Sequence, residues 1–519
     1  MSHLLPLFFF RVPSPARHAP ALLLGAMLAA CGGGSGTTPG QTAPLPPAPP
    51  PPPARGSLVQ AASPVTVTLP GGLSATSLTP AAMRSLMEDA LEGFVKLAGE
   101  PRCTVSAYRL QYRSSGLPGG ALAEAGAALL LPSGSDASCS GPRPVLLYAH
   151  GTSLDKNYDM AKLTGEARMV AALFAAQGYI VVAPNYGGYA GSSLGYHPYL
   201  DAKQQANEMV DALRAARATL GTLGSSASSR LFLAGYSQGG YVALATQRAM
   251  QEAYPGEFQV AAVAGMSGPY ALAQFADTIF SGDPGRGITA FLPMLSTAAQ
   301  RGGAALYGTA GEMYEAQYAN GIETLLPGTL GGSELAALGK LPANALFARD
   351  SLPQPVGATA FFGEPHLVRS TYRAAYLADQ AAQPCGADPA KPLACAPQHP
   401  LRKWVAVNDL RNYRPASRLM LCGGHEDPTV SFNNTTASAA YFRAAGAAPD
   451  VLDLDQSENM NDPYLLYRLG FSAARLMLKA DALSRGKDAR EAVAESYHAG
   501  LVAPFCLLAA RDYFWRDIP

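Results

Sequence analysis

The sequence is poor in charge and shows no excess of either sign. Lysine and arginine total 38, aspartate and glutamate also total 38, and charged residues make up only 15% of the 519 residues. A nucleic-acid-binding domain would show a basic excess, so this composition argues against nucleic acid as a partner. Hydrophobic residues, at 48%, can supply a large core. The length suits one large domain with an insertion, or two domains.

No hydrophobic run near the start is long enough to span a membrane. The apolar run at 19–30 follows two arginines, and about a dozen residues are too few for a spanning helix, so we predict a signal peptide. Its ending, Leu-Ala-Ala-Cys31, resembles a bacterial lipobox. That resemblance implies a lipoprotein signal peptide at 1–30, cleavage before Cys31 and lipidation of its sulfur. Because Gly32 follows, it also implies an outer-membrane anchor facing the periplasm or cell surface. An ordinary signal peptidase site nearby is the alternative.

A biased segment follows the cysteine. Residues 32–56 begin with glycine and serine and continue into a proline run. Glycine and serine give a flexible chain, whereas consecutive prolines favour the stiffer polyproline II conformation. We therefore assign 31–60 to the lipidated cysteine and a Gly/Pro-rich tether, which we expect to be disordered.

Metal-binding patterns are also missing, because no Cys-His spacing resembles a metal site. With Cys31 assigned to lipid, six cysteines remain, and in an exported chain six suggest three disulfides. Spacing alone permits fifteen pairings. Our preference is for the pairs Cys103–Cys139, Cys385–Cys395 and Cys422–Cys506.

From Pro144 onward, apolar strands and helical patterns alternate along the chain. Runs such as 145–149 and 179–183 are continuously apolar, as strands of a parallel sheet buried on both faces must be. This alternation is typical of βαβ units. Two earlier strands, at 105–112 and 121–131, would form an antiparallel start. We predict an α/β fold with a mostly parallel central sheet and helices on both faces.

One long segment interrupts this alternation. Residues 270–413 contain several short helical patterns and apolar-aromatic clusters. We interpret them as a helical cap inserted above a core formed by residues 61–269 and 414–519. Such a cap excludes water and shapes a binding pocket.

The most informative stretch lies between an apolar strand and a helical pattern, at residues 230–246. It contains Gly235-Tyr-Ser237-Gln-Gly239, a G-x-S-x-G nucleophile elbow in the strand-to-helix context that it requires. The glycines leave room for strand and helix to pass closely, so that Ser237 can be held exposed on a strained turn. The N–H of Gln238, at a helix start, would supply half of an oxyanion hole. The alternative is a glycine-rich turn that only starts a helix.

A serine nucleophile needs a base and an orienting acid, which in this architecture follow in the order acid, then histidine. Asp427 lies in a loop just past a predicted strand, and His498 is the only histidine beyond it. His498 would carry the proton, and Asp427 would hold its tautomer and stabilise the imidazolium. Asp427 could instead be a turn or N-cap residue, with Glu426 as its rival, and His498 could be a surface histidine.

The second oxyanion donor should come from the loop after the strand that ends near His150. The N–H of Gly151 or of Thr152 can point at the developing charge. His150 itself is better explained as a structural side chain than as a second base.

These motifs carry a resemblance to a known family. From about residue 100 to the C-terminus, the chain resembles bacterial members of the secretory lipase branch of the α/β-hydrolases. The resemblance rests on His150-Gly-Thr152, the elbow around Ser237, Gly424-x-x-Asp427-x-x-Val430, Pro184-Asn-Tyr-Gly-Gly188 and His197-Pro-Tyr-Leu200. In that family the segment beginning at Pro184 commonly reads Pro-Asp-Tyr. Asn185 departs from this pattern and receives no catalytic role.

The resemblance implies hydrolysis of carboxylic esters without a cofactor, by an esterase or lipase. The substrate would be a small-molecule or lipid ester, and the membrane would be reached through Cys31. A serine peptidase on the same fold is the alternative, but the acidic residues of the predicted cap (Glu312, Glu315 and Glu323) single out no pair that would hold a free α-amine. A surface lipoprotein that uses a hydrolase scaffold only for binding is the third possibility.

Overall fold

The computed structural model describes residues 54–516, except 70, 71, 73, 91–94, 96, 97, 117, 118 and 457–460. The predicted signal peptide, Cys31 and most of the predicted tether lie outside the described residues. The end of the predicted tether, 54–60, belongs to the fold instead. Arg55 forms an ion pair with Asp211 at 2.9 Å, and strand β1 (Leu58–Pro64) pairs with β5 (Thr104–Ser115).

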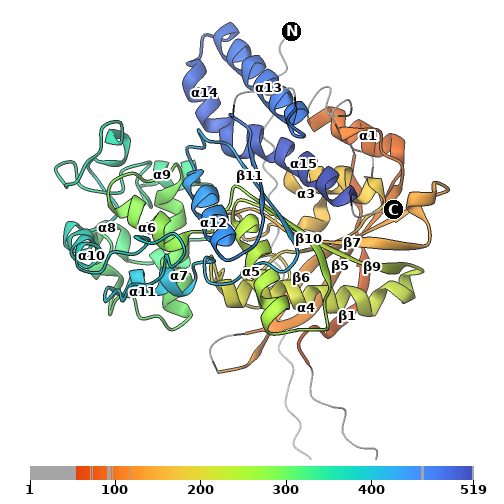
Figure 1. Ribbon diagram of the computed structural model, residues 1–519, viewed down its shortest axis with the longest axis horizontal. Coiled ribbons are helices and arrows are strands. Elements are labelled where there is room, and N and C mark those ends of the chain that lie inside the picture. Colours follow the sequence, from red (N-terminus) through yellow and green to blue (C-terminus); the bar gives the residue numbers. More distant parts are fainter. Residues whose placement is uncertain are drawn as a thin grey trace, which may run out of the picture. The chain divides into compact units, whose positions relative to one another are not determined.

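A large mixed sheet runs through the part of the chain that the structure describes, in the order β1-β5-β6-β8-β7-β9-β10-β11-β12 (Figure 1). From β8 to β12 the neighbouring strands are parallel, whereas β1, β5, β6 and β8 pair antiparallel. The remaining strands of this sheet are β4 (Ser77–Leu78), β6 (Leu122–Ser133), β7 (Pro142–Ala149), β8 (Ile180–Pro184), β9 (Ser226–Tyr236), β10 (Val260–Met266), β11 (Arg418–Gly423) and β12 (Asp450–Asp453). Strands β2 (Val67–Thr68) and β3 (Ser74–Ala75) form a separate pair.

Helices cover both faces of this sheet (Figure 1). On β7 and β9, Leu147 and Leu233 pack into the same core as helices α4 (Ala202–Leu220) and α5 (Gln238–Glu252). Their chain neighbours Leu146 and Phe232 face the opposite core, because successive side chains of a strand point to opposite faces. That core is completed by α1 (Pro80–Ala90), α3 (Glu166–Leu173) and α15 (Ala503–Trp515). The predicted fold class is thus confirmed.

The segment between β10 and β11 is helical. Within 270–413, all of which the structure describes, there is no named strand of the sheet. Its helices are α6 (Leu272–Phe280), α7 (Ile288–Arg301), α8 (Ala316–Ala319), α9 (Gly332–Ala337), α10 (Ser370–Ala382) and α11 (Pro400–Val407). We call this segment the cap.

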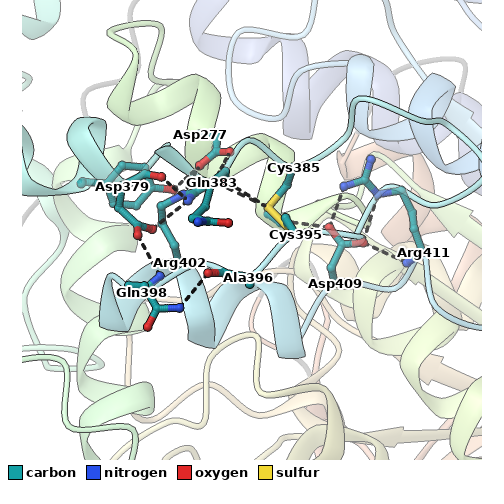
Figure 2. Close-up of a disulfide and its surroundings, with 12 residues drawn as sticks. Asp277, Asp379, Gln383, Cys385, Cys395, Ala396, Gln398, Arg402, Asp409 and Arg411 are labelled. Atoms are coloured by element: carbon teal, nitrogen blue, oxygen red, sulfur yellow. Dashed lines mark hydrogen bonds and ion pairs between the residues drawn. A yellow bond between two sulfur atoms is a disulfide. The ribbon is translucent and has the colours of Figure 1, made fainter. Parts of the chain in front are cut away.

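Arg402 on α11 joins three parts of the cap (Figure 2). Its buried guanidinium donates to Asp277 of α6 at 3.1 and 3.2 Å and to Asp379 of α10 at 2.7 Å. It also donates to the backbone carbonyl of Gln383 at 3.0 Å. The two carboxylates compensate for burying this cation, so one side chain holds α6, α10 and α11 together.

Three disulfides join Cys103 to Cys139, Cys385 to Cys395 and Cys422 to Cys506. These are the pairs that the sequence analysis favoured. The second lies in the cap beside Arg402 (Figure 2). The third joins β11 to α15 across 84 residues, with a Cα–Cα distance of 5.7 Å.

Four helical segments follow β11: α12 (Asn433–Ala444), α13 (Leu465–Ser484), α14 (Ala489–Ser496) and the π-helical turn η8 (Tyr497–Val502), which leads into α15. The continuous stretch Ala489–Trp515 is long and apolar enough to cross a membrane, but 61% of its most apolar window is buried in the protein. Because α15 packs on β9, β10 and β11, this stretch is a core helix of the domain.

Candidate active site

Ser237 lies on a sharp turn between β9 and α5, with φ 58° and ψ −124°. This conformation is strained for a residue with a side chain, and the flanking glycines make it possible. A Cβ on Gly235 would lie 2.0 Å from the carbonyl oxygen of Gly239, and one on Gly239 would lie 1.9 Å from that of Ala149. Only glycine fits at either position, so the elbow requires both.

Backbone hydrogen bonding fixes this turn and leaves one donor available. The Ser237 N–H donates to the carbonyl of Met266 on β10 at 2.8 Å. The Gln238 N–H opens α5, where the first amides of a helix have no intrahelical acceptor and the helix dipole favours negative charge. An anion formed at Ser237 would therefore meet this amide.

His498 and Asp427 lie together, although they come from segments 71 residues apart. His498 Nδ1 is 2.6 Å from Asp427 Oδ2. The other oxygen of Asp427 accepts the backbone N–H groups of Thr429 at 2.9 Å and Val430 at 3.2 Å. The Tyr236 hydroxyl donates to the carbonyl of His498. Both partners of the pair are thus held by backbone contacts.

The remaining nitrogen of His498, Nε2, is buried and has no hydrogen-bond partner among the described residues. Ser237 and His498 are therefore not hydrogen-bonded to each other in this structure. Such contacts are often long without substrate and tighten when it binds. This buried nitrogen has no partner, and the carbonyl of its own residue accepts the hydroxyl of Tyr236, the chain neighbour of Ser237, so His498 lies in the part of the fold where a base for Ser237 is needed.

Glu426, the rival of Asp427 in the sequence, points elsewhere. Its carboxylate forms an ion pair with Arg475 of α13 at 2.8 Å, and its side chain is more than half exposed. Asp427, by contrast, is buried and in contact with His498.

A carboxylate that was not predicted from the sequence contacts the loop after β7. Glu166, the first residue of α3, accepts the Gly151 N–H, 3.0 and 3.1 Å from its two oxygens, and the Tyr148 hydroxyl at 2.6 Å. Burial raises the pKa of Glu166 to about 7. An acidic residue in the first turn of a helix is a common capping feature, so nothing in the sequence distinguished it.

This contact affects the two predicted oxyanion donors differently. The Gly151 N–H is engaged by Glu166, whereas the Thr152 N–H makes no hydrogen bond to a described residue. The Thr152 hydroxyl lies 3.2 Å from that of Tyr199. Of the two amides, Thr152 is the one available to a ligand.

Two buried histidines hold the surrounding loops. The ring nitrogens of His150 lie 2.6 Å from the Gly151 carbonyl and 3.1 Å from the Asn185 carbonyl, and burial lowers its pKa to about 4. His197 Nδ1 lies 2.8 Å from the Gly187 carbonyl, and burial lowers its pKa to about 3. If His197 Nδ1 donates to that carbonyl, its Nε2 accepts the Gln238 side-chain amide at 2.6 Å. His197 thus holds the residue whose N–H faces the nucleophile.

An apolar pocket begins at Ser237 and extends into the cap. Its wall comes from α6, α7 and α11 of the cap, with Tyr199 and the loop after Asp427 at its edge. The lining side chains that matter here are Leu272, Phe275, Ala276, Leu292, Leu401 and Val405. Arg286 is the one charged residue in the described lining. The described residues contain no cluster of three or more histidines, cysteines or carboxylates arranged to hold a metal ion.

Arg286 also connects the cap with the segment that carries His498. Its backbone N–H donates to the Pro428 carbonyl at 2.7 Å, one residue past Asp427. Its guanidinium forms an ion pair with Glu491 of α14 at 2.7 Å. The rim of the pocket thus contacts the loop of Asp427 and the helix, α14, that leads to His498.

Comparison with known proteins finds similarity to hydrolases, both in a family model and among solved structures. The model of the prolyl oligopeptidase family matches residues 166–281, which include Ser237. Among solved structures, the rice cell wall degrading esterase LipA from Xanthomonas oryzae is 25% identical, with a TM-score of 0.66. The match covers 90% of this chain and 100% of LipA. A ligand-bound form of LipA gives the same TM-score and coverage at 24% identity.

A predicted hydrolase from Legionella pneumophila is 18% identical, with a TM-score of 0.61 over 86% of this chain and 96% of its own. At this identity the likeness concerns the fold alone. No curated protein matches the chain.

Proposed function

We propose that this chain cleaves carboxylic esters through an acyl-enzyme on Ser237. The premise is that the chain is an α/β-hydrolase of the esterase and lipase type. His498 would act as general base and Asp427 would orient it. The observation that carries this proposal is the state of His498: its Nδ1 is held by Asp427 at 2.6 Å, and its buried Nε2 has no partner among the described residues. A base held in this way has one tautomer available for catalysis.

The reaction would proceed in two halves. Ser237 Oγ attacks the ester carbonyl carbon while its proton passes to His498 Nε2, and the new oxyanion accepts the N–H groups of Gln238 and Thr152. Collapse breaks the bond to the leaving alcohol, which takes the proton from His498. Water, deprotonated by His498, then attacks the carbonyl carbon of the acyl-enzyme. The bond to Ser237 Oγ breaks, Oγ takes the proton back from His498, and the carboxylic acid is released.

The pocket supports an acyl group as the part of the substrate that it binds. Its wall is formed almost entirely by aliphatic and aromatic side chains, and it ends at Ser237. An alkyl chain placed there would be removed from water, and such burial contributes about 0.8 kcal/mol per CH₂. Small-molecule or lipid esters with an apolar acyl chain are the substrates that it fits.

A serine peptidase is the second candidate, because the matching family model is that of prolyl oligopeptidases. An aminopeptidase-like substrate needs acidic side chains around its free amine. The described pocket lining contains no aspartate or glutamate. Nor do the three cap glutamates form a pair: Glu312 caps the turn at Thr309, Glu323 pairs with Arg301, and Glu315 lies near His366. The lining therefore favours the ester.

One experiment separates these functions. The purified chain is incubated with p-nitrophenyl esters and with aminoacyl-nitroanilides, and with a fluorophosphonate probe that labels activated serines. We expect ester turnover and labelling at Ser237, both abolished in Ser237→Ala and His498→Ala while the unfolding midpoint is unchanged. Retained ester turnover in Ser237→Ala would overturn the assignment, and turnover of nitroanilides alone would favour the peptidase. A folded chain that neither turns over nor reacts would support a binding protein.

We further propose that the chain is exported and anchored through a lipidated Cys31. The lipobox-like sequence supports this, and the three disulfides require an oxidising compartment. Metabolic labelling with a fatty acid should mark the wild-type chain but not Cys31→Ser. Release of both chains into the medium without label would contradict the anchor.

A further inference from the structure

Helix α13 presents an apolar stripe to solvent along most of its length. The stripe consists of Leu466, Leu469, Ala473, Leu476, Ala480 and Leu483, and all six are exposed. Its four leucines expose between 41% and 77% of their surface, and the adjacent Met477 exposes 66%. These are half of the large hydrophobic residues exposed in the described part of the chain. A contiguous apolar face of this kind indicates a contact surface.

The opposite face of α13 already has its partners. Phe471 and Ala482 are buried, and Tyr467, Ala474 and Leu478 pack against the same core. Figure 1 shows α13 beside α14, with α15 lying between α13 and the sheet. The helix therefore needs only one of its two apolar faces to stay folded on the domain.

The spacing of the stripe indicates what it contacts. Its members follow each other at intervals of 3, 4, 3, 4 and 3 residues. This is the a/d repeat of a coiled-coil seam, in which another helix packs against the stripe. A helix that lies on a lipid surface needs no such repeat, because lipid chains do not interdigitate with side chains in register.

The order of leucine and alanine along the stripe indicates which helix packs against it. If a second α13 lies antiparallel, Leu466 meets Leu483 of the second copy, Leu469 meets its Ala480, and Ala473 meets its Leu476. Each of the four central layers then pairs a leucine with an alanine, so the gap between the helices has constant width. In a parallel pair four layers would each join two leucines and the other two would each join two alanines, so the width of the gap would vary. We therefore infer that α13 is a dimer interface, occupied by α13 of a second copy of this chain in antiparallel orientation.

The charges beside the stripe agree with this pairing. The stripe itself contains no charged residue, and Lys479, on its edge, would face Ser472 of the second copy. No like charges oppose each other across the seam, which is a requirement for an interface in which both partners present the same surface.

The buried area is small for a protein interface, which indicates a weak and transient dimer. The five large side chains expose on average about 60% of their surface, and at about 120 Å² for each fully exposed side chain the two copies together bury about 700 Å². The alanines and the aliphatic stem of Lys479 add to this area. A specific interface needs about 1,000 Å², so we expect dissociation in the micromolar range.

Sedimentation velocity of the full chain tests the interface, with Cys31→Ser to exclude lipid. We expect a monomer–dimer equilibrium that Leu476→Lys shifts toward monomer, with a dissociation constant raised at least about tenfold. Leu338→Lys is the matched control, because Leu338 is 61% exposed but lies in the cap, far from α13 in the chain. Turnover of a short ester and the unfolding midpoint show that each variant is folded. A wild-type chain that stays monomeric at 200 µM, or an unchanged dimer in Leu476→Lys, would overturn the inference.

Cysteine pairing tests the orientation. Chains with Ala473→Cys are mixed with chains carrying Leu476→Cys and oxidised. We expect faster cross-linking than in a mixture of Ala473→Cys with Leu466→Cys. Faster self-linking of Ala473→Cys than of the first mixture would show a parallel pair and contradict the register. If the monomer instead floats with phosphatidylcholine vesicles and Leu476→Lys does not, the stripe binds lipid and the inference fails.

Discussion

The backbone N–H of Gly151 donates to the carboxylate of Glu166, 3.0 and 3.1 Å from its two oxygens. An acid with a pKa raised by burial thus lies against the loop that offers Thr152 to the proposed oxyanion. A cap and a buried pocket complete the site.

Glu166→Gln should change how stability depends on pH. Burial raises the pKa of Glu166 from 4.5 to about 7 in the folded protein, so the folded state holds this proton more tightly than the unfolded state. The stability that protonated Glu166 gives to the wild-type protein is therefore fully present below pH 4.5 and is lost as the pH rises through 7. Relative to wild type, the variant should gain stability between pH 5 and pH 8, as measured by urea unfolding.

The same variant should affect catalysis. Above pH 7 the wild-type carboxylate is ionised near the oxyanion loop, where its negative charge opposes the negative charge of the transition state. We expect the ratio of kcat/KM, variant over wild type, to rise about threefold between pH 6 and pH 8. Glu252→Gln, an exposed substitution on α5, serves as control. A ratio that is flat or that falls with pH would show that Glu166 does not act on the site by its charge.

Asp427→Asn should lower kcat by about 10³–10⁴-fold, because an amide at this position favours the wrong tautomer of His498. Glu426→Gln is the matched control, since it neutralises the adjacent carboxylate, which pairs with Arg475 instead. We expect that control to stay within about threefold of wild type. Steady-state kinetics on one soluble ester measures both. If Glu426→Gln were the more damaged variant, the two acids would have to exchange roles.

Ala276→Leu should narrow the pocket in the cap. Ala276 lies on α6 and lines the pocket that begins at Ser237. Three added carbons should lower kcat/KM for octanoyl esters about tenfold and leave acetyl esters nearly unchanged. Ala253→Leu, at the exposed end of α5, adds the same group away from the pocket. Equal losses for both chain lengths would show that the acyl group does not enter there.

Arg402→Met should destabilise the cap. It leaves Asp277 and Asp379 without their cation, and breaking a buried ion pair in this way costs about 3–5 kcal/mol. Lys403→Met, at the next position of the same helix, is exposed and should change the free energy of unfolding by less than about 0.5 kcal/mol. Urea unfolding compares the two. Similar free energies of unfolding for the two variants would mean that the ion pairs of Arg402 with Asp277 and Asp379 contribute no net stability.

Much of the architecture could be predicted because its signals are local. The continuous apolar runs of β7 to β9 predict buried strands, and the glycines around Ser237 predict a tight turn, each from a few neighbouring residues. Boundaries were less certain. Helix α4, for example, begins at Ala202 because the Asp201 side chain accepts the Gln204 N–H and caps it, whereas Pro198, four residues earlier, is also a typical residue at a helix start. Within the cap, where the sequence shows only short helical patterns, residues 310–319 form two short pieces, 310–312 and 316–319, in place of one helix.

Parts of the site could not be predicted because they depend on contacts between distant segments. His498 lies inside η8, a wide helical turn continuous with α14 and α15, and no local signal in the sequence predicts such a turn. The role of Glu166 exists only because α3 brings it against Gly151. The prediction of a tether was wrong for residues 54–60 for the same reason, because Arg55 forms an ion pair with Asp211, which lies 156 residues further along the chain.

The Cys422–Cys506 disulfide encloses α12, β12, α13 and α14 within one covalent loop. The connection between α13 and α14, at 485–488, is exposed to proteases. A cut there would leave two polypeptides that cannot drift apart, one carrying Ser237 and Asp427 and the other carrying His498. Nicked molecules should therefore run as a single band on a denaturing gel until a reductant is added, and a cut at this connection would not by itself separate the residues of the proposed site.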